Sequence, residues 1–473
     1  MFGQGASFLL HMGSTVVLAR LLTPQDYGLI GMVTAVTGFV AMFKDMGLSM
    51  ATVQKAEINH GQISTLFWIN VLLSFGVMLV TAALAPAIAW FYGEPRLTWI
   101  TLALASAFIF GGFTVQHQAL LRRNMRFGTL AFIHIASILA GIVVAFIAAW
   151  YGLRYWALVL MQVATAIAGA IAVWVVCPWR PSLPVRRSGV RKMLAFGANL
   201  TGFSFLNYFA RNLDNVLIGK VWGTQPLGFY SKAYGLLMLP LGQITAPIAA
   251  VAVPALSRLQ DDPERYRRYY YRAISTIAFI TMPLIAMLAA LSHEIIRIVL
   301  GDQWISAAPI FKVLAFAAVL QPVVNPVGWV FVSLGQADRQ LRWAIVAVPL
   351  IVLSFVLGLP WGAFGVAVSY TLCSLTVLTF PALWWTFRLS PLSIRGWLNS
   401  IRCPLVASSI MYLTIEILRH YLTSYYKPLS AVFLLGAVGV SCFLVAIAIS
   451  RTGREEAYAA WRLLRHLQPN VTV

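Results

Sequence analysis

The chain has 473 residues, of which 60% are hydrophobic and only 10% are charged, and its formal net charge is +20. A soluble globular domain would carry about 25% charged residues, so this composition excludes a soluble fold and is typical of a polytopic membrane protein. A nucleic-acid-binding protein gathers its basic residues on one solvated face, whereas here they occur in short groups between apolar segments. We therefore exclude nucleic acid as a partner.

Apolar segments of about 20 residues, the length that crosses a bilayer core, recur along the whole chain. They predict an all-α, polytopic membrane protein with about 14 transmembrane helices. The predicted spans are residues 2–19, 28–43, 65–91, 97–120, 128–150, 155–177, 193–218, 228–250, 273–292, 306–333, 343–359, 362–387, 403–418 and 428–450.

The positions of the 34 lysines and arginines predict the orientation of these spans. Loops after even-numbered spans, together with the C-terminal tail, hold 24 of them, whereas the opposite loops hold 7. Short cytoplasmic loops collect basic residues, so both termini are predicted to be cytoplasmic.

The basic, proline-containing segment 178–192 divides the predicted spans into two groups of six. We predict an N-terminal lobe at 1–177, a cytoplasmic basic linker at 178–192 and a C-terminal lobe at 193–388. Two further helices follow at 389–450, and then a cytoplasmic tail at 451–473. An even number of spans per copy predicts that the two lobes are related by an axis along the membrane normal.

A polar stripe on an otherwise apolar helix begins each predicted lobe. In the second lobe, one face of about 100° of arc holds Ser204, Asn207, Arg211, Asp214 and Asn215. The matching positions, 200 residues earlier, hold Gln4, Ser7, His11, Ser14 and Thr15. Arg20 likewise matches Lys220, and Gly28 matches Gly228. This internal repeat predicts that the two stripes line a polar cavity.

Charged residues inside a span are costly, so Arg211 and Asp214 form the first functional hypothesis. The alternative is a structural ion pair between residues three apart near a helix end. Lys312, six residues into the predicted span 306–333, either lines the cavity or extends its amine to the membrane surface. Glu416 at the end of the span 403–418 is interpreted as interfacial.

Gln321 and Asn325 are one helical turn apart, beside Pro322 and Pro326. Proline removes backbone hydrogen bonds, and in a membrane the freed groups need protein or water around them. The pattern predicts a broken helix that faces water, and Asn325 joins the candidate cavity residues.

Several motifs are missing from the sequence. There is no GxxxxGK[ST] segment for ATP, and the four cysteines show no CxxC spacing that would indicate metal or disulfides. The outer loops are short and carry no paired carboxylates suited to acid–base or metal chemistry. We therefore predict no enzymatic activity, no catalytic residue, no cofactor and no metal site, and interpret the chain as a carrier.

Six segments have distinctive sequences: LARLLTPQDYG at 18–28, DMGL at 45–48, NLDNVLIG at 212–219, LGFY at 227–230, VPALSRLQDD at 253–262 and GDQW at 301–304. In this order, and over nearly the whole chain, they resemble the polysaccharide flippases of the MOP superfamily, the O-antigen and colanic-acid exporter type.

This resemblance implies a two-lobed protein of the bacterial inner membrane. Its expected substrate is an undecaprenyl-pyrophosphate-linked oligosaccharide, moved from the cytoplasmic to the periplasmic leaflet for exopolysaccharide, capsule or O-antigen biosynthesis. Membrane lipids are implied partners, and a polysaccharide polymerase and export machinery are further candidates. Arg211 would then bind the phosphates, and rocking of the two lobes would give alternating access.

Three alternatives remain open. A MATE-type drug antiporter would favour acidic cavity residues, which are few here. A membrane glycosyltransferase or polymerase would need carboxylates at its outer face. A lipid II flippase has the same predicted helix count, and only substrate tests distinguish it.

The charge pattern generates a test of topology. Reporters fused after residue 187 and after residue 268 should report cytoplasm, and a reporter fused near residue 224 should report periplasm. Alkaline phosphatase activity at either of the first two positions would contradict the 14-helix topology.

Overall fold

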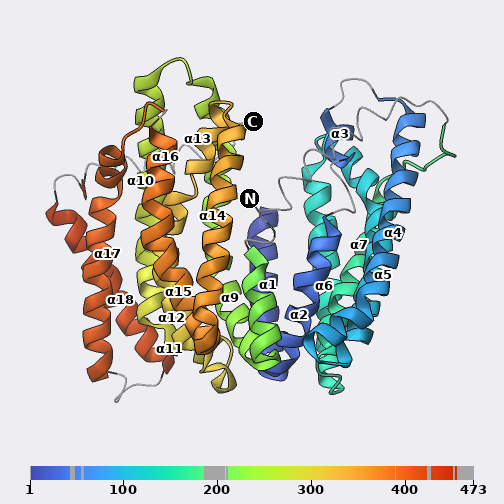
Figure 1. The fold of residues 1–473 in the computed structure, drawn as a ribbon, viewed down its shortest axis with the longest axis horizontal. Coiled ribbons are helices and arrows are strands. Elements are labelled where there is room, and N and C mark those ends of the chain that lie inside the picture. Colours follow the sequence, from blue (N-terminus) through green and yellow to red (C-terminus); the bar gives the residue numbers. More distant parts are fainter. Residues whose placement is uncertain are drawn as a thin grey trace. The chain divides into compact units, whose positions relative to one another are not determined.

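The structure, a computed structural model, describes residues 2–42, 48–54, 58–185, 208, 211–388, 390–422, 428–450 and 453–454. Within these residues all regular secondary structure is helical, and ten helices are long and apolar enough to cross a membrane (Figure 1). Contacts divide the chain into two compact units, Met1–Ser231 and Lys232–Val473. The predicted all-α, multi-pass fold is therefore confirmed.

The described part of the first unit contains helices α1 to α7, a further helix at residues 211–222 and the start of α9. The bounds are α1 (Phe2–Leu21), α2 (Pro24–Ala41), α3 (Leu48–Gln54), α4 (His60–Tyr92), α5 (Arg96–Arg123), α6 (Phe127–Trp150), α7 (Trp156–Val176) and α9 (Thr224–Arg258). The contact boundary at Ser231 falls inside α9. The sequence instead divides the lobes at 178–192, and that division stays a prediction.

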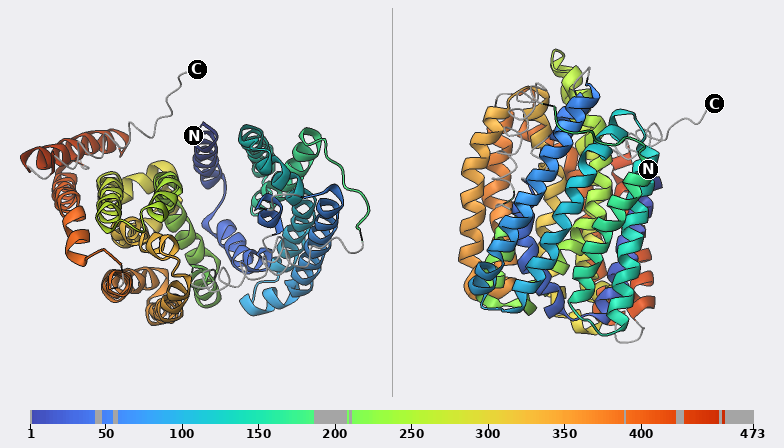
Figure 2. Two further views of the ribbon diagram at one scale, coloured as in Figure 1. Left: turned by 90° about the horizontal axis from the view of Figure 1, so that it is seen from above. Right: turned by 90° about the vertical axis from the view of Figure 1, so that its right-hand side faces the viewer.

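The second unit continues from α9 and contains the remaining helices. These are α10 (Pro263–Ala290), α11 (Ser292–Val299), η1 (Asp302–Trp304), α12 (Ala307–Val324), α13 (Val327–Ser333), α14 (Ala337–Gly358), η2 (Leu359–Trp361), α15 (Gly362–Leu372), η3 (Cys373–Leu378), α16 (Thr379–Phe387), α17 (Ile394–Leu422) and α18 (Pro428–Ile449). Within each unit the long helices run side by side (Figure 2).

The predicted spans match these helices closely. The spans 2–19 and 28–43 correspond to α1 and α2, and 306–333 corresponds to α12 followed by α13. That span is interrupted at Asn325 and Pro326, so the predicted break is confirmed. The span 193–218 falls largely outside the described residues.

The turn between α4 and α5 shows how local sequence ends one span and starts the next. Gly93 ends α4 with φ of 72°, a left-handed conformation that favours glycine. Arg96 then donates two hydrogen bonds, each 2.8 Å, to the carboxylate of Glu94. This contact lowers the pKa of Glu94, a loop residue, because a nearby guanidinium stabilises the charged carboxylate.

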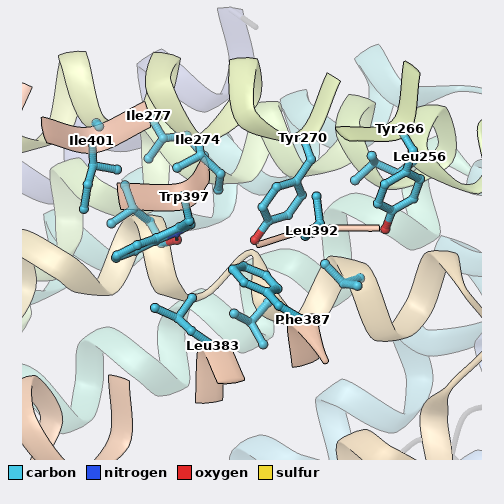
Figure 3. Packing of buried hydrophobic residues seen from close by; sticks show 14 of the residues in the cluster. Leu256, Tyr266, Tyr270, Ile274, Ile277, Leu383, Phe387, Leu392, Trp397 and Ile401 are labelled. Carbon is cyan, nitrogen blue, oxygen red and sulfur yellow. Dashed lines mark hydrogen bonds between the residues drawn. The ribbon is translucent and has the colours of Figure 1, made fainter. Parts of the chain in front are cut away.

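An aromatic core holds the second unit together around the broken helix (Figure 3). Trp397 of α17 is 1% exposed, and its indole N–H donates to the carbonyl of Val323 at 3.0 Å. Tyr266 of α10 and Ser333 of α13 share a hydrogen bond of 2.7 Å between their hydroxyls. Buried aromatic residues with polar ends thus fix both sides of the break.

Ion pairs attach α17 to the rest of the second unit. Lys312 of α12 lies 2.8 Å from Glu416, and Arg419 lies 2.8 Å from Glu294 of α11. Arg419 also donates to the carbonyl of Ala290. Glu294 is buried, with 7% exposure, whereas the side chain of Glu416 is 35% exposed. Removing one partner of such a pair leaves an uncompensated buried charge.

The second unit therefore yields a stability prediction. Arg419→Ala should destabilise the protein by roughly 3 kcal/mol, because Glu294 then stays buried without its cation. The measurement is the thermal unfolding midpoint of the purified protein in detergent. Arg297→Ala is the matched control, since its pair with Asp302 is largely exposed and should contribute less than about 1 kcal/mol. Equal midpoints for the two variants would contradict this assignment.

Candidate substrate site

The polar stripe of the second predicted lobe lies on the helix at residues 211–222, within the first unit. Ser204 and Asn207 lie outside the described residues. Arg211 is exposed, and among the described residues it makes no ion pair. The predicted cation is thus accessible to a ligand.

Asp214, in contrast, is almost fully buried, with 5% exposure. Its carboxylate accepts a hydrogen bond of 2.9 Å from the hydroxyl of Tyr230 and one of 2.7 Å from the backbone N–H of Asn215. Among the described residues, no ion pair joins Asp214 to Arg211. The polar residues of this stripe therefore have two roles, a buried acceptor and an exposed cation.

Side chains on α1 show the same division. Ser7 and Ser14 each bond to a carbonyl of their own helix, at 2.9 Å and 3.0 Å. Such bonds satisfy a hydroxyl locally and leave little capacity for a ligand. His11 is exposed, whereas the side chain of Gln4 lies outside the described residues. Among the stripe residues whose side chains the structure describes, Arg211 and His11 are the exposed ones.

Asn215, another residue of this stripe, has a hydrogen-bond acceptor without a partner in the described part of the chain. The side-chain carbonyl of Asn215 is buried and has no hydrogen-bond partner within the described part of the chain. Buried polar groups are normally satisfied, so an unpaired one marks a place where water or a ligand can complete the contact.

The two copies of the repeat meet at a pair of matching glycines. A Cβ atom on Gly28 would overlap the carbonyl oxygen of Thr224, and one on Gly228 would overlap the carbonyl oxygen of Pro24. The two contacts are equivalent under the repeat, since Gly28 matches Gly228 and Pro24 matches Thr224 with the same offset of 200 residues as in the polar stripes. The N-terminal ends of α2 and α9 therefore approach each other at backbone distance, which only glycine permits.

Two tyrosines that the sequence analysis did not select complete this region. Tyr230 supports Asp214, and Tyr208 donates 2.8 Å to the backbone carbonyl of Ala35 on α2. Neither has a counterpart 200 residues earlier that is a tyrosine, because Ile30 and Phe8 occupy those positions. Tyr230 belongs to the LGFY motif, and Tyr208 lies between the stripe residues Asn207 and Arg211.

The remaining candidates belong to the second unit. Lys312 bonds to Glu416 and its amine lies 5.8 Å from the ring centre of Tyr412, so its charge is already balanced within that unit. Asn325 is exposed at the break between α12 and α13 and lines a cavity there. No group of three or more His, Cys, Asp or Glu that could hold a metal ion occurs among the described residues.

These observations define the class: a multi-pass, all-helical membrane protein with an accessible cation on a polar helix stripe. The chain belongs to the polysaccharide biosynthesis protein family, whose model matches residues 17–309. This match confirms that the chain resembles polysaccharide biosynthesis proteins.

Relatives of known name agree with this family. The chain is 27% identical over 377 residues to the lipopolysaccharide biosynthesis protein WzxC of Escherichia coli K12, covering 77% of this chain and 75% of WzxC. It is 27% identical over 398 residues to the teichuronic acid biosynthesis protein TuaB of Bacillus subtilis 168, covering 84% and 82%. It is 22% identical over 453 residues to the succinoglycan biosynthesis transport protein ExoT of Rhizobium meliloti 1021, covering 95% and 90%.

Solved structures support the fold. The lipid II flippase MurJ in an inward closed conformation has a TM-score of 0.76 at 15% identity, covering 95% of this chain and 97% of MurJ. An inward-facing MATE-family multidrug transporter has a TM-score of 0.61 at 14% identity, covering 80% and 94%. At these identities the likeness shows the fold alone.

The glycine contact can be tested directly. Gly228→Ala should destabilise the protein by about 1–3 kcal/mol, because the added methyl group forces two backbones apart. Gly235→Ala on the same helix is the matched control, since its Cβ would meet nothing within 4 Å. The measurement is the thermal unfolding midpoint of each purified variant. An unchanged midpoint for Gly228→Ala would contradict the close approach.

Proposed function

We propose that this protein is a flippase that moves an undecaprenyl-pyrophosphate-linked oligosaccharide from the cytoplasmic to the periplasmic leaflet of a bacterial inner membrane. Its product serves surface polysaccharide biosynthesis, as exopolysaccharide, capsule or O-antigen. The single observation that carries the proposal is Arg211: an exposed guanidinium in an apolar chain, beside an aspartate that already has other partners.

The chemistry of the substrate explains why such a cation is needed. A pyrophosphate bearing hydrated sugars cannot cross hydrocarbon without polar contacts. Arginine presents a planar set of donors that matches two phosphate oxygens at once. Because Tyr230 and the Asn215 N–H occupy the carboxylate of Asp214, Arg211 remains available for the phosphates.

The transport step follows the alternating-access mechanism. Two lobes rock about the glycine contact, and the bound headgroup is exposed to one side of the membrane and then the other, while the lipid tail stays in the bilayer. The protein carries out no covalent chemistry in this scheme. The names of the relatives, which include polysaccharide biosynthesis and succinoglycan transport, support this reading.

Two related functions are less well supported by the site. A drug antiporter of the MATE type would need a carboxylate open to a cation, but the carboxylate of Asp214 is buried and hydrogen-bonded. Lipid II shares the undecaprenyl pyrophosphate, so a lipid II flippase would use the same cation. The polysaccharide family match over residues 17–309 favours the oligosaccharide.

The proposal predicts the behaviour of Arg211 variants. Arg211→Ala should lower the flipping rate roughly 10- to 100-fold, the loss expected for a charged hydrogen bond worth about 1.5–3 kcal/mol. Arg211→Lys should recover part of the rate, because lysine keeps the charge but loses the two-pronged geometry. The measurement is surface polysaccharide in a strain lacking the native gene, with membrane levels of each variant quantified.

Two controls make this test decisive. Arg265→Ala removes an exposed arginine paired with Asp262 and should leave export unchanged. Adding Asp214→Ala to Arg211→Ala should not restore export, since the two side chains are not paired in the structure. Recovery in the double variant would show that Arg211 acts only on Asp214, and the phosphate assignment would fail.

A further inference from the structure

A cavity of about 180 Å³ lies inside the second unit, at the break between α12 and α13. Its walls come from that broken helix, from α14 and from the continuous stretch α15, η3 and α16. The polar or aromatic side chains that line it are Gln321, Asn325, Trp343, Tyr370, Ser374 and Thr379. No charged residue lines it.

Every wall of this cavity contains proline close to the lining residues. Pro322 and Pro326 flank Asn325, Pro349 follows Ala347 on α14, and Pro381 follows Thr379 on α16. Proline lacks a backbone N–H, so each one frees a carbonyl group within a membrane-spanning segment. Such groups are tolerated at membrane depth where they line a polar cavity.

The wall formed by α15, η3 and α16 has an irregular backbone. Residues Cys373–Leu378 form a π-helical turn, and both the N–H and the hydroxyl of Thr379 bond to the carbonyl of Ser374. The hydroxyl bond measures 2.7 Å. Short π-helical turns inside α-helices occur frequently at functional sites. Proline at three walls and a π-turn at one of them together indicate a built site.

Some of the polar side chains that line the cavity are bonded to each other, and others have no partner among the described residues. The amide nitrogen of Gln321 donates to the hydroxyl of Tyr370 at 2.6 Å, which fixes both side chains. The side-chain amide of Asn325 and the indole N–H of Trp343 have no hydrogen-bond partner among the residues that the structure describes. An amide offers a donor and an acceptor side by side, and Trp343 adds a flat aromatic face.

This chemistry selects a class of ligand. Without a charged residue, the cavity offers nothing to hold a phosphate or a cation strongly. Adjacent hydroxyl groups of a sugar match the donor and acceptor of one amide, and the C–H face of the ring packs on an aromatic face. The volume of about 180 Å³ equals roughly six water molecules, which is also enough for a single sugar ring.

We propose that this cavity binds one neutral sugar ring of the lipid-linked oligosaccharide, with Trp343 as the stacking surface and Asn325 as the hydroxyl-reading group. This assignment rests on the proposed function and adds a second recognition element to it. Arg211 in the first unit binds the pyrophosphate that all such lipids share. The cavity in the second unit distinguishes a lipid that carries a sugar from one that does not.

The test compares two kinds of lipid on the purified protein in nanodiscs. One is undecaprenyl pyrophosphate without sugar, and the others carry a single glucose, galactose or N-acetylglucosamine. The wild-type protein should bind at least one sugar-bearing lipid roughly five- to tenfold more tightly than the bare lipid. Trp343→Ala should remove that preference and keep the affinity for the bare lipid, whereas Trp343→Phe should retain most of it.

Matched variants separate this proposal from the function it rests on. Trp384→Ala removes an exposed tryptophan of α16 that does not line the cavity, and it should keep the full preference. Arg211→Ala should weaken the binding of both kinds of lipid by the same factor and leave the ratio of the two affinities unchanged. Retained affinity for the bare lipid in Trp343→Ala shows that this variant is folded.

The same experiment distinguishes a failure of the sugar-site proposal from a failure of the proposed function. If the wild-type protein binds the bare lipid and every sugar-bearing lipid equally, or if Trp343→Ala keeps the preference, the cavity is not a sugar site and the flippase proposal stands. If neither kind of lipid binds the wild-type protein, the proposed function itself is wrong.

Discussion

In a membrane-spanning chain, a polar or charged group away from water is costly without a partner, and three charged side chains among the described residues follow this constraint. Asp214 is held by Tyr230 and a backbone N–H, Glu294 by Arg419, and Lys312 by Glu416. Against this background an exposed arginine such as Arg211, on a helix of an apolar chain, is informative. A charge costs several kcal/mol at the bilayer centre, and such residues are often found along substrate pathways.

The same constraint explains where the helices are irregular. Proline in a lipid-facing helix leaves a carbonyl group unsatisfied, so interrupted helices gather around polar space. In the second unit the break at Asn325 and the π-turn ending at Leu378 border one cavity. At the break, the carbonyl of Val323 receives a hydrogen bond from the buried indole of Trp397. The aromatic core thus stabilises the irregular backbone that forms the cavity wall.

Most of the fold could be predicted from the sequence because apolar segment length and proline position are local signals. The broken helix at Asn325 and the repeat that pairs Gly28 with Gly228 are examples. Partners distant in sequence could not be predicted: Lys312 and Glu416 are 104 residues apart, and their pairing depends on how α17 packs on α12. Tyr230 lies on the helix after Asp214, so helical periodicity carries no information about their contact. The sequence shows which residues are charged, but not which of them pair with an opposite charge.

The distribution of charge also bears on what drives transport, given the proposed function. Moving about two negative charges outward across an inside-negative membrane is favourable by roughly 2.3 kcal/mol per charge for each 100 mV, or nearly 5 kcal/mol in total. If Arg211 moves with the pyrophosphate, its positive charge offsets one of these, and about half of that energy remains. Coupling through Asp214 would instead require a cation to reach a buried carboxylate that already accepts hydrogen bonds from Tyr230 and the Asn215 N–H. Given the proposed function, we therefore expect the membrane potential to drive transport, since this requires no cation to reach the buried Asp214.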